Sequence, residues 1–313
     1  MRDALISRIY EIMHEKESLF FLTADFGAPS LDQLRENFPD RFINTGIAEQ
    51  NLINVATGLA MEGAVVYAYA IAPFLTMRAF EQIRINLSLQ SYSKKLNVNL
   101  IGVGAGLSYD VSGPTHHCIE DIILMRLLPN FTVFSPSDWI LTEKIVDQTV
   151  IVNKPKYLRL DAKPLPEIYK KTDVVKIEDG FRVINKGKDT CIVSTGYMTH
   201  TASKAVKRLK GSNINAGLID MFCLKPVNEE KLFETLRRYR CIVTLEEAFI
   251  NKGGMDSVIL SILNKNKSGI ILKNIGFEDK YIFEYGGREH LHRSNGLDIE
   301  SIVNTVKDCY LQL

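Results

Sequence analysis

Hydrophobic positions along the chain alternate between two kinds of segment. Short, nearly continuous apolar runs, such as AVVYAYAI (64–71) and VNLIGVG (98–104), are typical of strands buried on both faces of a sheet. Stretches with a helical spacing of apolar residues, such as AEQNLINVATGLAM (48–61), lie between them. This alternation favours an α/β fold with mostly parallel sheets covered by helices. In the first half, strands are predicted at 20–26, 64–71, 98–104, 131–135 and 157–160, and helices at 48–61, 75–90, 119–128 and 137–151.

The alternation is interrupted once, where the composition changes. Between Lys163 and Lys188 the chain is rich in Pro, Lys, Asp and Gly, and we interpret residues 166–187 as a linker. We therefore expect two domains, residues 1–165 and 188–313. In the second, strands are predicted at 191–195, 215–221, 241–247 and 270–277, and helices at 199–210, 228–239, 254–264 and 297–309.

The composition excludes several classes of protein. Apolar residues make up 46% and charged residues 24%, which is ordinary for a globular chain. Lys and Arg number 38 against 37 Asp and Glu, so no net field favours nucleic acid or an anionic membrane. No apolar run approaches the roughly 18 residues of a membrane span, and the charged N-terminus does not resemble a signal peptide. The five cysteines, at 118, 191, 223, 241 and 309, are dispersed, and this spacing predicts buried free thiols in a reducing cytoplasm.

Three polar or glycine-rich segments follow predicted strands of the first domain. They are ADFGAPS (24–30), GIAEQ (46–50) and GVGAGLSYDVSGPTHH (102–117). Ligands of open α/β sheets bind at the carboxyl ends of the strands, so we expect these segments to form one site. Glu49 stands at the start of a predicted helix, where the helix dipole favours an acid for purely structural reasons.

The ordered set of motifs resembles a known family. GIAEQN, APFLTMRAFEQIR and GPTHH, followed by IEDI and MRLLPNFTVFSP, resemble the C-terminal half of transketolase. The same pattern occurs in the related deoxyxylulose-phosphate synthases and in the β subunits of 2-oxoacid dehydrogenases. The resemblance covers nearly the whole chain and includes LIDMFCLKPV and LEEAFINKGG in the second half. It implies a pyrimidine-binding domain followed by a transketolase C-terminal domain.

The resemblance also implies thiamine diphosphate as cofactor. Glu49 matches the family acid that gives a proton or a strong hydrogen bond to N1′ of the cofactor's pyrimidine ring. A carboxyl group in apolar surroundings suits that task, because burial favours its protonated form. Ile47, Ala48 and Leu52 are expected to provide those surroundings.

Aromatic and imidazole side chains complete the expected site. Phe74 matches the family aromatic that stacks on the pyrimidine, although a core position is the ordinary explanation for a phenylalanine. Phe80 and Phe26 are further candidates for contact with the cofactor. His116 matches the histidine that faces the reacting carbon, where it can bond a substrate hydroxyl or move a proton. The adjacent His117 is expected to point elsewhere.

Substrate contacts follow from the resemblance less completely. Arg2, Ser30 and Arg159 match family positions that contact a substrate phosphate. Two positions depart from the usual pattern. Gly104 stands where transketolases carry another phosphate-binding histidine, and Ser112 replaces the acid before GPTH, with Asp110 two residues earlier. We therefore expect a sugar substrate other than the common pentose phosphates, either unphosphorylated or linked to a nucleotide.

The diphosphate and Mg²⁺ half of the family's cofactor site is missing from the sequence. Family members bind them with a GDG motif and a downstream Asn, and no GDG occurs in this chain. Mg²⁺ prefers oxygen ligands in octahedral geometry, and no such set is recognisable, so no metal ligand is assigned here. The resemblance thus predicts a separate N-terminal subunit that ligates most of the Mg²⁺, in an α2β2 assembly.

The function implied is transfer of a two-carbon ketol unit from a ketose donor to an aldose acceptor. Two alternatives stay open: a subunit that decarboxylates pyruvate or another 2-oxoacid, and a paralogue without catalytic activity. In the second domain, Glu246 and Glu247 precede a predicted helix, which favours a role at the helix start. The segment 286–297, GGREHLHRSNGL, could approach either the site or a partner.

Overall fold

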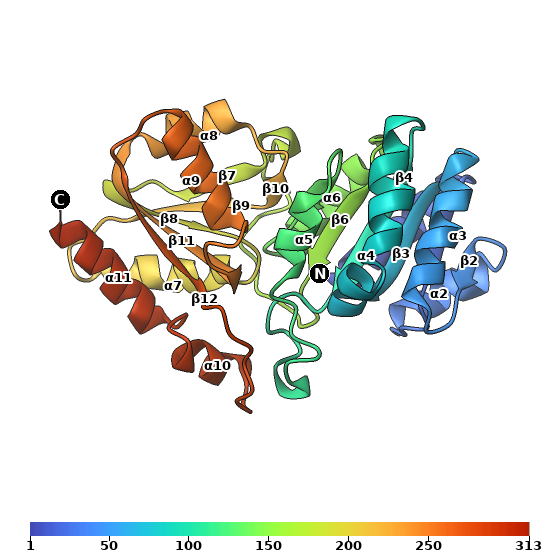
Figure 1. Cartoon of the computed structure of the whole chain (residues 1–313), viewed down its shortest axis with the longest axis horizontal. Coiled ribbons are helices and arrows are strands. Elements are labelled where there is room, and N and C mark those ends of the chain that lie inside the picture. Colours follow the sequence, from blue (N-terminus) through green and yellow to red (C-terminus); the bar gives the residue numbers. More distant parts are fainter. Residues whose placement is uncertain (313) are drawn as a thin grey trace.

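The computed structural model describes residues 1–312 and contains two α/β units that lie side by side (Figure 1). Each unit is built on a mostly parallel sheet with helices on both faces, so the predicted fold class is confirmed.

The first sheet has seven strands in the order β10-β5-β6-β4-β3-β1-β2. Neighbouring strands are parallel, except that β10 runs antiparallel to β5. β4 is buried along its whole length, as its continuous apolar run predicts. The strands are β1 (Leu19–Thr23), β2 (Phe42–Asn44), β3 (Val65–Ile71), β4 (Asn97–Val103), β5 (Thr132–Phe134), β6 (Lys156–Leu160) and β10 (Cys223–Lys225).

Helices cover both faces of this sheet. The helices α1, α2 and α6 pack on one face, and α3, the segments after β3 and α5 pack on the other. The segment predicted as one helix at 75–90 winds irregularly and is partly π-helical. The elements are α1 (Arg2–Glu15), α2 (Ser30–Asn37), α3 (Glu49–Met61), η1 (Phe74–Arg78), α4 (Phe80–Gln82), η2 (Ile83–Leu89), η3 (Gln90–Tyr92), η4 (Asp110–Ser112), α5 (Asp121–Leu127) and α6 (Trp139–Ile151).

The second sheet has five strands in the order β12-β11-β8-β9-β7, and only β7 is antiparallel to its neighbour. Its strands are β7 (Phe181–Asn185), β8 (Asp189–Ser194), β9 (Gly217–Met221), β11 (Tyr239–Phe249) and β12 (Ile271–Phe277). The helices are α7 (Met198–Lys210), α8 (Glu229–Leu236), α9 (Met255–Lys265), α10 (Arg288–Ser294) and α11 (Ile299–Leu311), and a short η5 (Ile177–Asp179) precedes β7. Within residues 1–312, no helix combines the length and the apolar composition that crossing a membrane requires.

The boundary between the units differs from the one predicted. Residues 181–185 form β7 of the second sheet, so the predicted linker 166–187 is too long at its C-terminal end. In addition, β10 of the second half extends the first sheet through β5. Both strands are short and pair with distant partners, so neither has a local hydrophobic pattern that would reveal it.

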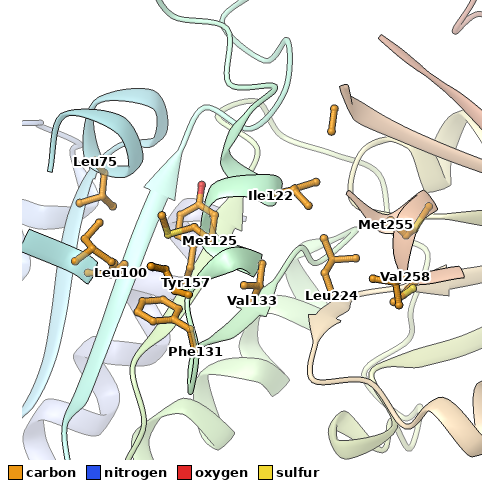
Figure 2. Close-up of a cluster of buried hydrophobic side chains, with 14 of the residues drawn as sticks. Leu75, Leu100, Ile122, Met125, Phe131, Val133, Tyr157, Leu224, Met255 and Val258 are labelled. Carbon is orange, nitrogen blue, oxygen red and sulfur yellow. The ribbon is translucent and has the colours of Figure 1, made fainter. Parts of the chain in front are cut away.

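The apolar core also crosses this boundary. Figure 2 shows buried side chains that continue from Leu75 through Tyr157 to Leu224 and Met255, from the first unit into the second. Burial of this continuous apolar surface holds the two units in one arrangement.

Two of the five cysteines contradict the prediction of free thiols. Cys241 in β11 and Cys309 in α11 form a disulfide, although 68 residues separate them in the sequence. Packing of α11 beside β11 brings their Cα atoms to 6.3 Å, a proximity that sequence spacing does not encode. The remaining three, Cys118, Cys191 and Cys223, are buried and free, and burial raises the pKa of Cys223 to about 12.

Candidate functional site

A tight turn delivers Glu49 to the carboxyl edge of the first sheet. After β2, Asn44 Oδ1 accepts the N–H of Gly46 at 3.0 Å, and Gly46 adopts a left-handed φ of +74°. The helix α3 then begins at Glu49, whose side chain is only 4% exposed. Ala48 occupies the N-cap position and makes no side-chain capping bond.

The partner of Glu49 is an arginine that the sequence analysis did not single out. Arg78 donates from Nη1 to Oε2 of Glu49 at 2.6 Å, and 47% of its side chain is exposed. Leu52 is fully buried as expected, but Ile47 is 77% exposed, so Ile47 does not contribute to apolar surroundings. The carboxylate is therefore enclosed on one side by the core and covered on the other by a half-exposed cation.

Arg78 also links Glu49 to the aromatic part of the site. Its guanidinium lies 4.7 Å from the centre of the Phe74 ring, within the range of a cation–π contact. Both residues belong to the π-helical segment η1, and segments of this kind are frequent at functional sites. Their spacing of four residues in an ordinary apolar sequence gave no sign of this arrangement.

Phe74 in turn meets His116 edge to face, with 5.2 Å between ring centres. Contacts thus run from Glu49 through Arg78 and Phe74 to His116, and they join all three motifs of the resemblance. Tyr109 approaches His116 from another side, with ring centres 6.4 Å apart. The loop that carries both residues is closed by paired backbone hydrogen bonds between Gly106 and Cys118.

The paired histidines of GPTHH have different surroundings. His116 is partly exposed, and its Nδ1 lies 3.0 Å from Oγ1 of Thr115. His117 is buried, its Nε2 lies 3.4 Å from the carbonyl oxygen of Asp110, and burial lowers its pKa. His116 is therefore the histidine that faces Phe74.

The other candidate aromatics lie outside this set of contacts. Phe26 stacks on Tyr69 with ring centres 5.1 Å apart, and Phe80 packs against the main hydrophobic core. The ordinary explanation for a phenylalanine, a position in the core, accounts for Phe80.

Two of the expected phosphate contacts converge on a carboxylate. Arg2 pairs through Nε with Oδ1 of Asp3 at 3.2 Å, and Ser30 donates its hydroxyl to the same oxygen at 2.9 Å. Burial acts to raise the pKa of Asp3, but the hydrogen bonds from Ser30 and Arg2 outweigh it and lower that pKa. The cation and the donor at this position are thus already paired with an anion of the chain.

Arg159 has an internal role rather than the expected contact with substrate. Its side chain is 2% exposed, and Nε donates to Oδ2 of Asp121 at 2.8 Å. Its Nη2 donates to the carbonyl oxygens of Cys118 and Glu247, each at 3.0 Å. We therefore correct the expectation that Arg159 contacts a substrate phosphate, because α5 and β11 enclose it in the finished fold.

The departures from the family pattern also acquire a structural context. Oδ2 of Asp110 accepts from Nζ of Lys163 at 2.6 Å and from the backbone N–H of Arg288 at 2.8 Å, so this acid is bound to the second unit and does not replace the one absent at Ser112, which is exposed. At Gly104, φ is +108° and the Tyr109 ring occupies the space that a side chain would need. Tyr109 therefore stands where a histidine at 104 would lie.

These side chains fit one half of thiamine diphosphate. A buried carboxyl, an aromatic face and an imidazole in mutual contact are the groups that an aminopyrimidine ring and a reacting carbon beside it need. For the other half, the described residues contain no group of three or more His, Cys, Asp or Glu that could hold a metal ion.

Comparison with known proteins identifies the family. Residues 1–166 match the family described as the transketolase pyrimidine binding domain, and residues 179–302 match the transketolase C-terminal domain. The chain belongs to the transketolase family. The predicted resemblance is thereby confirmed, and it covers both units of the fold.

Several members of the transketolase family match along almost the whole chain. One of the two subunits of an apulose-4-phosphate transketolase, from Actinobacillus succinogenes, is 33% identical over 86% of this chain and 85% of its own. The 6-deoxy-6-sulfo-D-fructose transketolase subunit SqwH of a Clostridium species is 28% identical, covering 98% and 94%. A solved structure described as a split gene transketolase, inactive beta4 tetramer, is 34% identical with a TM-score of 0.88, covering 98% and 97%.

Proposed function

We propose that this chain is the β-type subunit of a split, thiamine-diphosphate-dependent transketolase that transfers a two-carbon ketol unit from a ketose to an aldose. The observation that carries the proposal is the continuous contact from Glu49 through Arg78 and Phe74 to His116. In the transketolase family, this chain's two matched domains supply that half of the site.

Each of these side chains has a definite task in the proposal. Bound thiamine diphosphate supplies the carbon nucleophile. Glu49 holds a proton against the pyrimidine ring, from a position inside the core that keeps water away. Phe74 offers its ring face to the pyrimidine, a contact worth on the order of 1 kcal/mol. His116 bonds a substrate hydroxyl and moves a proton to or from it.

A second polypeptide is part of the proposal. We assign the diphosphate and most ligands of Mg²⁺ to a separate N-terminal transketolase-like subunit that carries a GDG motif, in an α2β2 assembly in the cytoplasm. The similarity to a β chain whose solved tetramer is described as inactive supports the need for such a partner. The Cys241–Cys309 disulfide is unusual for a cytoplasmic protein, so a count of free thiols in protein purified from the cell tests the location.

The natural substrate is proposed to differ from the common pentose phosphates. Asp3 occupies Arg2 and Ser30, Asp121 occupies Arg159, and Tyr109 covers Gly104. Relatives named for apulose 4-phosphate and for a sulfonated fructose support the use of an unusual sugar. An unphosphorylated or nucleotide-linked sugar acceptor fits these contacts best.

One observation favours a second candidate function. The 1-deoxy-D-xylulose-5-phosphate synthase of Aquifex aeolicus is 31% identical over 96% of this chain, which spans 47% of that enzyme. A subunit that decarboxylates pyruvate or a related 2-oxoacid is therefore the alternative. A paralogue without catalytic activity is less favoured, because Glu49, Phe74 and His116 retain their mutual contacts.

The deciding experiment reconstitutes the enzyme. The chain is co-purified with a candidate N-terminal subunit that carries GDG, and activity is measured with thiamine diphosphate and Mg²⁺ using either a ketose or pyruvate as donor. Ketol transfer by the pair, and none by either subunit alone, is expected. Activity of this chain alone contradicts the split site, and a preference for pyruvate selects the alternative. Xylulose 5-phosphate with ribose 5-phosphate as the best pair contradicts the unusual substrate.

A further inference from the structure

The loop that carries His116 is held by the C-terminal domain at two points. At its neck, Gly106 lies so close to Glu247 that a β-carbon would come within 2.7 Å of the carboxyl carbon of Glu247. At its tip, the carboxylate of Asp110 accepts the backbone N–H of Arg288 at 2.8 Å. Figure 1 shows this loop between β4 and α5 descending on the same side of the molecule as α10. Residues 106–118 are called the histidine loop below.

Arg288 and Glu247 form one buried unit. Arg288 donates from Nε to Oε1 of Glu247 at 2.8 Å, and its Nη2 pairs with Oε2 of the same carboxylate. The remaining Nη1 reaches Oδ2 of Asp161, in the first domain, at 2.5 Å. Both Arg288 and Glu247 have side chains that are at most 5% exposed, so water weakens these ion pairs little.

Two further side chains fix the geometry of this unit. Nε2 of His292 lies 2.6 Å from Oε1 of Glu247, and the Arg288 guanidinium lies 3.5 Å from the centre of the Tyr197 ring. Burial acts to raise the pKa of Glu247, but Arg288 outweighs it and holds that pKa well below its usual range. The carboxylate at the neck of the histidine loop is thus ionised and anchored at physiological pH.

The histidine loop passes this anchoring on to the site. The carbonyl of Asp110 lies 3.4 Å from Nε2 of His117, and the backbone N–H of both His116 and His117 reach the carbonyl of Gly113. A shift of Asp110 therefore moves the turn that aims His116 at Phe74.

We propose that Arg288 is a positioning residue: through Glu247 and Asp110, it makes the C-terminal domain fix the histidine loop and hold His116 against Phe74. This role rests on the proposed function only as far as catalysis is concerned. Arg288 is buried, lies outside the contacts from Glu49 to His116, and acts on them through the loop. It also gives the segment 286–297 a place at the site rather than at a partner.

A matched control separates positioning from general adhesion between the domains. Arg126 in α5 also bridges the domains, since it donates to the carbonyls of Leu224, Gly253 and Gly254. These three acceptors belong to the second half of the chain and lie outside the histidine loop. Arg126→Lys and Arg288→Lys are thus comparable changes at one interface, and Asp110→Asn alters the loop anchor while it preserves size.

The test measures His116 directly and catalysis separately. In the full-length chain labelled with ¹³C at histidine, His116→Gln assigns the His116 imidazole signal. We expect Arg288→Lys and Asp110→Asn to shift that signal beyond its linewidth and Arg126→Lys to leave it in place. In the reconstituted complex, the same two variants should lose about 10- to 100-fold in kcat, with KM for the ketose changed less than about threefold, as expected for a misplaced catalytic group.

Each result decides the question. An unmoved His116 signal in Asp110→Asn overturns the proposal, and so does a kcat loss in Arg126→Lys equal to that in Arg288→Lys. If Arg288→Lys does not fold, Asp110→Asn alone carries the comparison with Arg126→Lys. A wild-type complex without activity rejects the proposed function, but the His116 signal still decides whether Arg288 positions the loop.

Discussion

Arg78 covers the carboxylate of Glu49 from the opposite side of the site, with 2.6 Å between Nη1 and Oε2. The same guanidinium lies 4.7 Å above the ring of Phe74. Arg78 therefore occupies the two surfaces that a pyrimidine ring would use. Since 47% of its side chain is exposed, it can swing away without unpacking the core.

Removal of Arg78 should strengthen cofactor binding. In the reconstituted complex, we expect Arg78→Ala to lower the apparent Kd for thiamine diphosphate about fivefold, because a half-exposed ion pair worth about 1 kcal/mol no longer competes. Fluorescence titration measures this change. Arg84→Ala, which removes an exposed arginine paired with Glu81, is the control and should change nothing. Weaker binding in Arg78→Ala would show that Arg78 contacts the cofactor instead.

Glu49→Gln should nearly abolish turnover while the chain stays folded. The amide keeps the shape of the side chain but cannot exchange a proton with the pyrimidine, and loss of such a group costs about 10²- to 10⁴-fold in rate. Steady-state kinetics and circular dichroism check both parts. Glu62→Gln, at the exposed end of the same helix, is the matched variant that should keep full activity. Near-normal turnover of Glu49→Gln would reject its assigned task.

His116→Gln should lower kcat about 10²-fold or more, because glutamine can bond a hydroxyl but cannot move a proton at neutral pH. The change should be smaller in KM than in kcat. His290→Gln provides the control, since His290 is exposed in α10. Equal kinetics for the two variants would remove His116 from the reaction.

Arg159→Met should destabilise the chain rather than weaken substrate binding selectively. It leaves Asp121 buried without its ion-pair partner, a change that costs about 3–5 kcal/mol in comparable cases. Thermal unfolding of the isolated subunit measures the loss. If the variant instead unfolds at the wild-type temperature and raises only KM for a phosphorylated sugar, the original assignment to substrate was right.

Glu246 should make stability depend on pH. Burial raises its pKa from 4.5 to about 7, and both carboxylate oxygens accept N–H groups at the start of α9. The folded chain then binds this proton more tightly than the unfolded chain, so the stabilising contribution is complete below about pH 4.5 and is lost as the pH rises through about 7. Glu246→Gln should therefore lose less thermal stability than wild type as the pH is raised through this window. A parallel decline in both proteins would contradict the assignment, and Glu278→Gln on the exposed surface serves as control.

The predicted role of the paired acids was half correct. Glu246 accepts the N–H groups of Met255 and Asp256, as expected at a helix start, whereas Glu247 faces Arg288 and His292. Adjacent residues on a strand point to opposite faces, so the two acids meet different surroundings. The sequence shows the pair but not which elements cover each face.

The sequence by itself determined the alternation of strands and helices, the family, and the three motifs that carry Glu49, Phe74 and His116. These are encoded locally, because apolar periodicity and short motifs involve residues that are close along the chain. Only the tertiary structure decided that Arg78 covers Glu49, that Asp121 encloses Arg159, and that Cys241 meets Cys309. The same holds for the anchoring of the histidine loop by Arg288. Such pairs depend on how helices and domains pack, and packing follows the burial of apolar surface rather than the order of residues.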